Sequence, residues 1–322
     1  MKNPYTRSAD PSVPATEHAA FEDGAALVDL FHKTVLRLSG KDPLGMLNAI
    51  LTNEVPKEEH CGVYALLLNP KGRIRADLRV LKSDGDVLIN TEPEGTAAAK
   101  ELLGRYAPFS RVEVEDLSEA GVPWGILGLY GPQAEKLLDG LELAEHETAQ
   151  VKVGGVDLLA AGVATPVPGY DLLGPADALS AARDHLARRG AVPVGLQAYE
   201  TARVAAGIPR FGSDITPENF PAEVGILERA VSFEKGCYPG QETVARMHYR
   251  GHPNKTLYRL AIEGTPPAPG TEIFQGEKKV GHLTSLTSLP VNGEIFALGY
   301  LSRNANPQDT LHAADATLRP LA

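Results

Sequence analysis

The clearest pattern along the chain is a strict alternation of hydrophobic and polar residues over 73–81. Ile74, Ala76, Leu78 and Val80 alternate with Arg73, Arg75, Asp77 and Arg79. A period of two predicts a strand, and it puts Asp77 on the same face as three arginines. An apolar run over 62–69 precedes it, and the Asn-Pro-Lys-Gly that follows has the composition of a type I turn. The sequence therefore predicts a β-hairpin.

Helical spacing marks the segment before this hairpin. The turn at 39–43 ends in a capping aspartate with proline at the first helical position, and Leu44, Leu47 and Leu51 follow at helical intervals. The first ordered segment, 23–55, thus combines a strand-like start with a helix. After the hairpin we expect a strand at 86–90, a helix at 97–106 and a strand at 111–115.

A similar cycle follows in the middle of the chain. It consists of a strand at 125–130, a helix at 131–138, strands within 151–163 and a helix at 175–189. Two successive units of this kind indicate a pair of α+β layers and not a parallel, doubly wound sheet.

The last third of the chain changes character twice. A helix is expected at 196–206, and the long irregular stretch 208–225 after it is of a length that usually has a function. From residue 256 onward, short strands separated by Gly and Pro predict a compact all-β domain. The predicted division is a loose arm at 1–22, a first α+β unit at 23–118, a second α+β unit at 119–252 and a C-terminal β-barrel at 253–322.

Composition narrows the function without naming it. The chain has 322 residues, 43% of them hydrophobic, and a net charge of −10, which argues against coating of DNA or of an anionic membrane. Its two cysteines, Cys61 and Cys237, rule out a disulfide scaffold. Neither a signal peptide nor an apolar run of the ~18–20 residues that a membrane span needs is present. We therefore expect a cytoplasmic protein without DNA or membrane partners.

The densest polar segment lies at 233–251, and the common nucleotide-phosphate and hydrolase motifs are missing from the sequence. Cys237 stands between two glycines, next to Lys235 and just before a predicted helix start, where a thiolate would be stabilised. The alternative is a half-buried cysteine that packs in a turn. His248 and His252 have helical spacing, but Gly251 interrupts the helix between them and no further ligand is suitably placed, so we expect no metal.

Positive charge gathers in two clusters, at 71–82 and at 234–259. In a chain with net negative charge, such clusters suit an anionic ligand, either a polycarboxylate tail or RNA phosphates. Ordinary solvated faces remain an equal alternative.

The segment Lys-Gly-Cys-Tyr-Pro-Gly-Gln-Glu at 235–242 resembles the defining motif of the YgfZ family. The likeness extends over about 25–303 through shorter matching segments at 38–42, 68–74, 131–134, 202–209, 221–223 and 280–285. The resemblance implies a folate-binding protein related to the glycine-cleavage T-protein, with a role in iron–sulfur cluster assembly or repair and hence in tRNA modification. It implies an α+β cloverleaf in which two α+β units and a small C-terminal β-barrel surround a central folate channel.

Individual site residues follow from the same resemblance. Asp77 falls at the second acid of the T-protein's paired-acid motif, and Asp171 falls at the pterin-binding carboxylate, which can accept two neighbouring N–H donors. Arg203 matches the arginine of an R-x-E-A-G segment, and Tyr170 and Lys235 are expected to contact the cofactor, tetrahydrofolate or a derivative. Cys237 and Asp77 are the expected catalytic residues.

Two departures from the family pattern separate the candidate functions. Ala76 replaces the first of the paired acids, and Ala205 replaces the glutamate of the R-x-E-A-G segment. We therefore favour a folate-binding accessory protein in which Cys237 does thiol or cluster-related work, with iron–sulfur proteins or their assembly machinery as partners. The alternatives are a folate-dependent aminomethyltransferase or other one-carbon transferase that uses Asp77, and a scaffold with a vestigial pocket.

Overall fold

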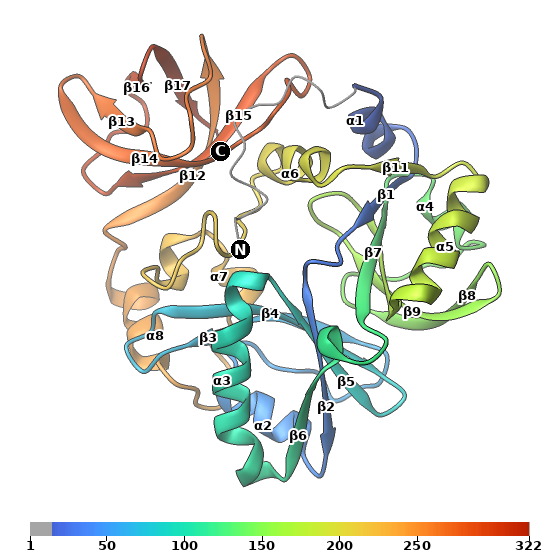
Figure 1. The fold of residues 1–322 in the computed structure, drawn as a ribbon. Coiled ribbons are helices and arrows are strands. Elements are labelled where there is room, and N and C mark those ends of the chain that lie inside the picture. Colours follow the sequence, from blue (N-terminus) through green and yellow to red (C-terminus); the bar gives the residue numbers. More distant parts are fainter. Residues whose placement is uncertain (1–14, 322) are drawn as a thin grey trace.

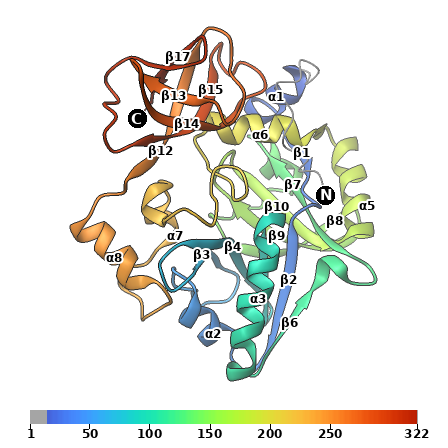
Figure 2. The same ribbon diagram turned by 60° about the vertical axis from the view of Figure 1, so that its left-hand side comes forward.

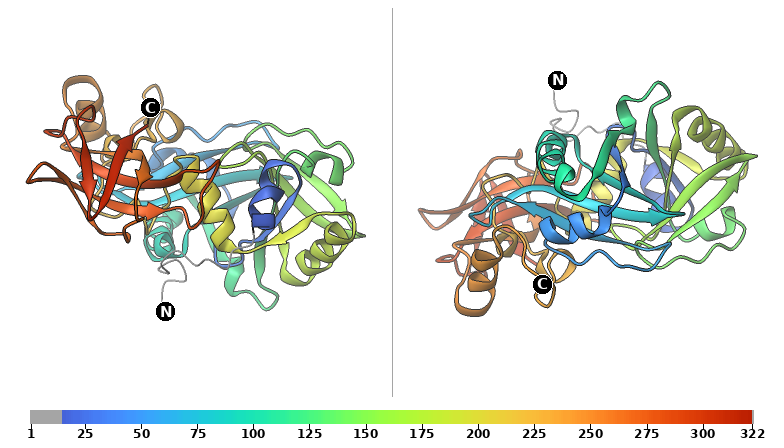
Figure 3. Two further views of the ribbon diagram at one scale, coloured as in Figure 1. Left: turned by 90° about the horizontal axis from the view of Figure 1, so that it is seen from above. Right: turned by 90° about the horizontal axis from the view of Figure 1, so that it is seen from below.

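The computed structural model describes residues 15–321, which form three bodies at the corners of a triangle (Figure 1). These are a five-stranded sheet with its helices, a six-stranded sheet with its helices, and a closed six-stranded barrel. Seen from above and from below, the C-terminal body and the middle part of the chain lie at opposite ends of the molecule (Figure 3). The predicted α+β class with a C-terminal β-barrel is confirmed. The predicted arm is only partly a loose segment, because Ala15–Glu22 forms helix α1, with Ala20 and Phe21 buried. The rest of that arm lies outside the described residues.

The five-stranded sheet contains the predicted hairpin, and its strand order is β3-β4-β5-β2-β6. The strands are β2 (Thr34–Gly40), β3 (Gly62–Leu68), β4 (Ile74–Ser83), β5 (Asp86–Thr91) and β6 (Val112–Asp116), and the helices are α2 (Pro43–Ile50) and α3 (Pro93–Ser110). The N-cap of α2 is Asp42, whose carboxylate accepts a hydrogen bond from the Gly45 amide, as the turn composition predicts. Helix α3 extends several residues beyond the predicted 97–106 at both ends.

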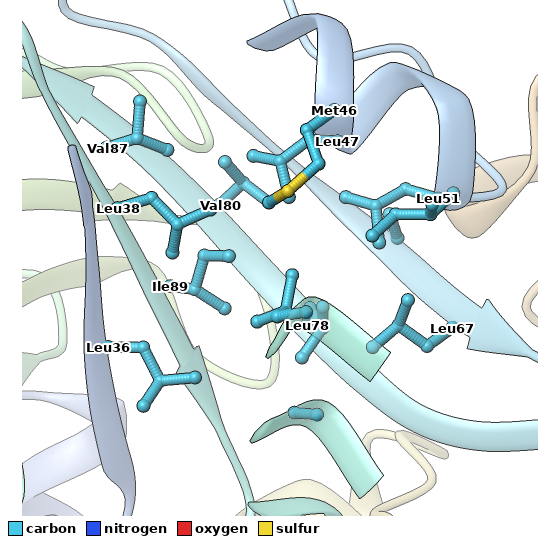
Figure 4. Close-up of a cluster of buried hydrophobic side chains, with 14 of the residues drawn as sticks. Leu36, Leu38, Met46, Leu47, Leu51, Leu67, Leu78, Val80, Val87 and Ile89 are labelled. Atoms are coloured by element: carbon cyan, nitrogen blue, oxygen red, sulfur yellow. The ribbon is translucent and has the colours of Figure 1, made fainter. Parts of the chain in front are cut away.

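Alternation in β4 separates a core face from a cavity face. Ala76, Leu78 and Val80 point into a buried cluster with Met46 and Leu47 of α2 (Figure 4). Because side chains in a strand alternate, Asp77 and Arg79 point the other way, toward the centre of the molecule. The hydrophobic core under this sheet thereby fixes which way Asp77 faces.

The six-stranded sheet has the order β11-β1-β7-β10-β9-β8. Its strands are β1 (Ala26–Asp29), β7 (Trp124–Tyr130), β8 (Thr148–Val153), β9 (Val156–Val163), β10 (Gly169–Pro175) and β11 (Val192–Val194), and the helices α4 (Ala134–Leu137) and α5 (Ala176–Arg188) belong to the same unit. A short 3₁₀ turn, η1 (Leu117–Glu119), connects the two sheets. Strand β1 lies in the predicted first unit but pairs with β7 and β11, so the first unit contributes one strand to the second sheet.

The C-terminal barrel begins where the sequence predicts a change to short strands. Its strands are β12 (Lys255–Glu263), β13 (Glu272–Gln275), β14 (Lys278–Leu286), β15 (Ile295–Ser302), β16 (Leu311–Ala313) and β17 (Ala316–Pro320). They close in the order β12-β15-β14-β13-β16-β17 around a small core of leucine, isoleucine and alanine side chains.

The segment between the second sheet and the barrel runs back across the five-stranded sheet (Figure 2). It contains α6 (Leu196–Ala205), the 3₁₀ turn η2 (Pro221–Glu223), α7 (Leu227–Ala230) and α8 (Gln241–Arg250). Tyr238 and Val244 pack against Leu66 and Leu68 of β3 in one buried cluster. The predicted second unit includes this segment, but past α6 it packs mainly on the first sheet and on the barrel.

A buried carboxylate joins α6, this connecting segment and the barrel. Asp214 is fully buried, and its Oδ2 accepts hydrogen bonds from Arg203 Nη1 at 2.6 Å and from the Arg210 amide at 3.1 Å. The hydroxyl of Thr284 in β14 donates to its Oδ1 at 2.5 Å, and the hydroxyl of Tyr300 in β15 donates to its backbone carbonyl at 2.8 Å. The barrel is therefore attached through a set of polar contacts that exclude water.

Substitution Asp214→Ala tests this attachment. Removing the Asp214 carboxylate leaves Arg203 with Glu200 as its one remaining ion-pair partner among the described residues and leaves the buried Arg210 amide and Thr284 hydroxyl without their acceptor, so we expect the free energy of unfolding to fall by about 3–5 kcal/mol. Urea denaturation followed by circular dichroism measures the change. Asp139→Ala, which breaks an exposed pair with Arg189, is the control and should cost less than about 1 kcal/mol. Equal effects of the two substitutions would contradict the assignment.

Candidate functional site

A cavity lies between the two sheets and is lined by residues from every part of the chain except the barrel. Its polar lining comes from Lys33, Tyr64, Asp77, Arg79, Asn90, Glu92, Tyr130, Glu145, His146, Asp171, Tyr199, Arg203, Arg210 and Arg229. The sheets contribute one face each, and α6, the loop after it and α7 close the side nearest the barrel. Three of the predicted site residues, Asp77, Asp171 and Arg203, are thus brought to one cavity, although Asp77 and Asp171 are 94 positions apart in sequence.

Asp77 is the least satisfied acid in the cavity. Its Oδ2 accepts a hydrogen bond from Tyr64 Oη at 2.9 Å, whereas Oδ1 is buried and accepts none from the described residues. Burial, and then the nearby negative charge of Glu92, raise the pKa of Asp77 from 3.8 to about 6. A carboxyl group with this pKa exchanges its proton close to neutral pH, as a general acid or base must.

Asp171 is held from both sides at the opposite wall. Arg79 Nη1 donates to its Oδ2 and Tyr130 Oη donates to its Oδ1, and the residue is 7% exposed. The Arg79 guanidinium also donates to the Gly162 carbonyl and to His146 Nδ1. A carboxylate has about four lone-pair positions, so Asp171 retains the capacity to accept N–H donors from a ligand.

Tyr170 does not line this cavity, contrary to the prediction. It neighbours Asp171 in β10, so its side chain points to the other face of the sheet. There it packs with Leu127, Leu129 and Leu172 near α5, and its hydroxyl donates to the Leu141 carbonyl. Tyr170 is a core residue in this structure.

Arg203 reaches the cavity, but its hydrogen-bonding groups are fully used by the protein. Five N–H donors make five bonds, two to Glu200 Oε2 and one each to Asp214, Ser285 Oγ and the Ile208 carbonyl. None is left for a cofactor. The predicted binding role is therefore replaced by a structural one.

The motif that contains Lys235 and Cys237 lies away from the cavity. Lys235 Nζ donates to the carbonyls of Asn48, at 2.8 Å, and Leu51 at the end of α2. Burial lowers the pKa of this amine to about 8. Lys235 thus fastens the motif to α2 and does not line the cavity. The Cys237 thiol is exposed to solvent, whereas Cys61 is half-buried and donates to the Glu58 carbonyl.

Glycine fixes how the motif meets the predicted hairpin. Gly240 has φ +85°, and a Cβ at this position would lie 2.6 Å from the Asn69 carbonyl oxygen and 2.8 Å from Gly72 Cα. The motif therefore packs directly on the turn of the β3–β4 hairpin, with α8 starting at Gln241. His248 in α8 stacks on Phe233, with ring centroids 4.1 Å apart. Within residues 15–321, no group of three or more metal-ligating side chains is placed to hold a metal ion.

Several cavity residues have no signal in the sequence. Lys33 and Glu92 form an ion pair at 2.9 Å, and Arg229 lies over the Tyr64 ring, 4.8 Å from its centroid, and pairs with Glu145 at 2.7 Å. Each comes from a turn, a strand end or a short helix, where no periodicity marks a functional side chain. For Glu92, the hairpin register between β4 and β5 could have indicated that it lies opposite Asp77.

This arrangement defines a class: an α+β protein with two sheets and a barrel around a charged central cavity. The family model described as the GCVT N-terminal domain matches residues 2–235, so the chain belongs to that family. Membership in the YgfZ family in particular stays a prediction.

Known relatives agree with this family. An aminomethyltransferase from Moorella thermoacetica is 28% identical over 303 residues, which cover 89% of this chain and 81% of the relative. A chloroplastic protein of Arabidopsis thaliana, whose name assigns it provisionally to the transferases, is 28% identical over 89% of this chain and 67% of its own length.

The fold has a counterpart among solved structures. The glycine cleavage system aminomethyltransferase T from Bartonella henselae matches with a TM-score of 0.83 at 20% identity, covering 95% of this chain and 87% of that protein. In the part of the chain that the structure describes, no helix is both long and apolar enough to cross a membrane. Because one relative is chloroplastic, a cytoplasmic location stays a prediction.

The Asp77→Asn substitution tests the charge state of the cavity. The folded-state pKa lies above the unfolded value, so folding takes up a proton between pH 3.8 and about 6, and stability is lost as pH rises through that window. Asparagine does not ionise, so the variant does not lose stability in this window. Asp77→Asn should therefore be more stable than the parent at pH 8 by up to about 3 kcal/mol. The gain should vanish near pH 4.

Urea denaturation at pH 4, 6 and 8 measures this difference. The exposed carboxylate Asp157, replaced in the same way, is the control and should show no such pH dependence. A stability difference that does not change with pH would show that Asp77 has an ordinary pKa.

Proposed function

We propose that this protein is a folate-dependent one-carbon transferase that binds a reduced folate in the central cavity. The observation that carries the proposal is Asp77, a buried carboxyl with one unpartnered oxygen in the cavity and a pKa of about 6. Tetrahydrofolate, when bound, supplies the nitrogen atoms that carry a one-carbon unit. Asp77 would hold or move the proton of an amine placed beside it.

The residues present are suited to such a ligand. Asp171 offers lone pairs to the neighbouring N–H donors of a pterin edge, at a wall kept rigid by Arg79 and Tyr130. Arg229 is one-third exposed, so it can meet an anionic tail at the edge of the cavity. The aminomethyltransferase names of the relatives support the same substrate class.

The substitution at position 76 argues less strongly against transfer than the sequence suggested. Ala76 points into the hydrophobic core, while Asp77 points into the cavity. A second cavity carboxylate, Glu92, comes from the neighbouring strand end. The chain therefore has two acids beside each other without two acids in sequence.

Binding of the folate is the first test. We expect tetrahydrofolate to bind by isothermal titration calorimetry, and Asp171→Asn to weaken binding by about 10–150-fold, because a hydrogen-bonded charge is worth ~1.5–3 kcal/mol. The matched control is Asp177→Asn, an acid on the first turn of α5 that is absent from the cavity lining. Unchanged affinity in Asp171→Asn would remove Asp171 from the binding site.

Turnover is the second test. Methylene-tetrahydrofolate formation from an aminomethylated carrier protein should fall by ~10²–10⁴-fold in Asp77→Asn, while folate affinity changes little. If the parent protein binds folate but gives no product from this or another amine donor, the transferase proposal fails.

A second candidate is the iron–sulfur accessory role, and one observation favours it. The Cys237 thiol is exposed on a motif held in place by Lys235 and Tyr238, outside the folate cavity. A thiol in this position can react with a partner protein or a cluster without disturbing the cavity.

The two cysteines provide a test of this candidate. Cys237 should react with iodoacetamide faster than Cys61 near pH 7, because Cys61 is partly buried and burial raises the pKa of its thiol. Cys237→Ser should then fold and bind folate normally, yet fail to restore cluster-dependent tRNA methylthiolation in cells lacking the protein. Full restoration by Cys237→Ser would exclude the accessory role of this thiol.

A further inference from the structure

Two carboxylates face each other across neighbouring strands at the cavity wall. The antiparallel register of β4 and β5 pairs Arg79 with Asn90, and extending it by two residues places Asp77 opposite Glu92, the residue that follows β5. The Thr91 hydroxyl donates to the Asp77 carbonyl at 2.7 Å, which keeps the strands together at this point. Like charges on facing positions of a sheet repel, so this arrangement is unfavourable unless something compensates it.

Nearby cations compensate the negative charge of Glu92 but not that of Asp77. Lys33 Nζ lies 2.9 Å from Glu92 Oε1, and Arg210 Nη1 lies 3.7 Å from Oε2. Burial alone would raise the pKa of Glu92, but these two cations outweigh burial and lower it. His32, 3.8 Å away, adds no charge near pH 7, because burial lowers its pKa to about 4. Glu92 is therefore a fixed negative charge.

The cations around Asp77 are paired with other acids. Besides Glu92, the titratable and charged groups that line the cavity with Asp77 are Tyr64 from β3, Arg79 on β4, Lys33 before β2, Tyr130 on β7, Glu145 and His146 before β8, Asp171 on β10, Tyr199 and Arg203 on α6, Arg210 from the loop after α6 and Arg229 on α7. Arg79 pairs with Asp171, Arg229 with Glu145, Lys33 with Glu92, and Arg210 with Glu200. Within the described chain, no cation lies within 4 Å of the Asp77 carboxylate.

Glu92 is also placed as a group that acts on the cavity. Its side chain is 8% exposed, the residue lines the cavity, and its Oε2 accepts no hydrogen bond from residues 15–321, although Arg210 Nη1 lies 3.7 Å away. An ion pair needed for stability alone would have its acceptors filled, as Asp214 does. Two carboxylates of one cavity, each with an oxygen that accepts no hydrogen bond from the described residues, indicate a site for a donor-bearing ligand.

We propose that Glu92, fixed as a carboxylate by Lys33, is a positioning residue that controls the proton on Asp77 and supplies the second acid of a two-carboxylate site. This inference rests on the proposed function, in which Asp77 exchanges a proton with a bound amine. Glu92 supplies the negative charge that is missing at position 76, where alanine replaces the first of the paired acids. Two acids with pKa values driven apart are the arrangement by which one carboxylate stays charged while the other exchanges a proton.

Direct titration of Asp77 tests the proposal without any folate. Protein labelled with ¹³C at the aspartate carboxyl carbons is titrated by NMR, and the Asp77 resonance is identified by its loss in Asp77→Asn. The parent should titrate near pH 6. In Glu92→Gln, the midpoint should move part of the way toward 3.8, because burial remains while the repelling charge is gone.

Opposite shifts separate an electrostatic role from a structural one. Lys33→Met should raise the Asp77 midpoint, since a positive charge that favours the Asp77 carboxylate is removed while Arg210 still favours the charged form of Glu92. Loosening of the structure would instead move both variants toward the ordinary value. Glu92→Asp keeps the charge and should keep a raised midpoint. Glu94→Gln, which removes a carboxylate 3.9 Å from Arg210, is the matched control and should leave the midpoint unchanged.

An Asp77 midpoint in Glu92→Gln that equals or exceeds that of the parent would overturn the proposal, and this arm decides alone if Lys33→Met does not fold. Because the titration uses ligand-free protein, its result is independent of folate binding. The role of Glu92 can therefore be confirmed where the proposed function fails, and the proposed function can be confirmed where the role of Glu92 fails. If turnover is observed, its acid limb should move to lower pH in Glu92→Gln, in step with the NMR midpoint.

Discussion

The buried ion pair between Arg203 and Asp214 is the contact on which the arrangement of the three bodies depends. Charges removed from water are costly, and a pair of this kind is stable only when the remaining donors and acceptors are also satisfied. Here the five N–H groups of Arg203 and both oxygens of Asp214 have partners, from α6, the connecting loop and the barrel. With α6 fixed, Tyr199 stacks on Tyr130 and completes one wall of the cavity.

In the cavity, unlike at the Arg203–Asp214 pair, one buried acid is left without a cation among the described residues. The cations of the cavity are distributed over Glu92, Asp171, Glu145 and Glu200, and Asp77 is left with a tyrosine hydroxyl and an open oxygen. Such an arrangement destabilises the fold locally, since a buried carboxyl that cannot ionise freely opposes folding at neutral pH. Proteins accept such local costs at functional sites, which is the physical reason why we propose a function for Asp77.

The cysteine motif is a second feature, separate from the cavity. Tyr238 is buried beside Leu66 and Leu68, and Lys235 holds the end of α2, so the loop is fastened on both sides of an exposed Cys237. Gly240 brings this loop onto the turn of the β3–β4 hairpin, a contact between segments that are about 170 residues apart in sequence. A change at Cys237 can therefore be studied without altering the cavity residues.

The sequence by itself determined the elements whose signal is local. Alternation over 73–81 gave the hairpin strand and the face of Asp77, helical spacing gave α2, and the spacing of Gly and Pro gave the barrel. Tertiary structure decided what depends on partners far along the chain. Of the neighbours Tyr170 and Asp171, only one can face the cavity, and the packing of α5 on the sheet selects it. Arg203 is occupied by groups up to 82 residues away, and Glu92 meets Asp77 only through strand register. Local patterns fix which side chains share a face, but which partners a buried charge finds is decided when the sheets, the connecting segment and the barrel come together.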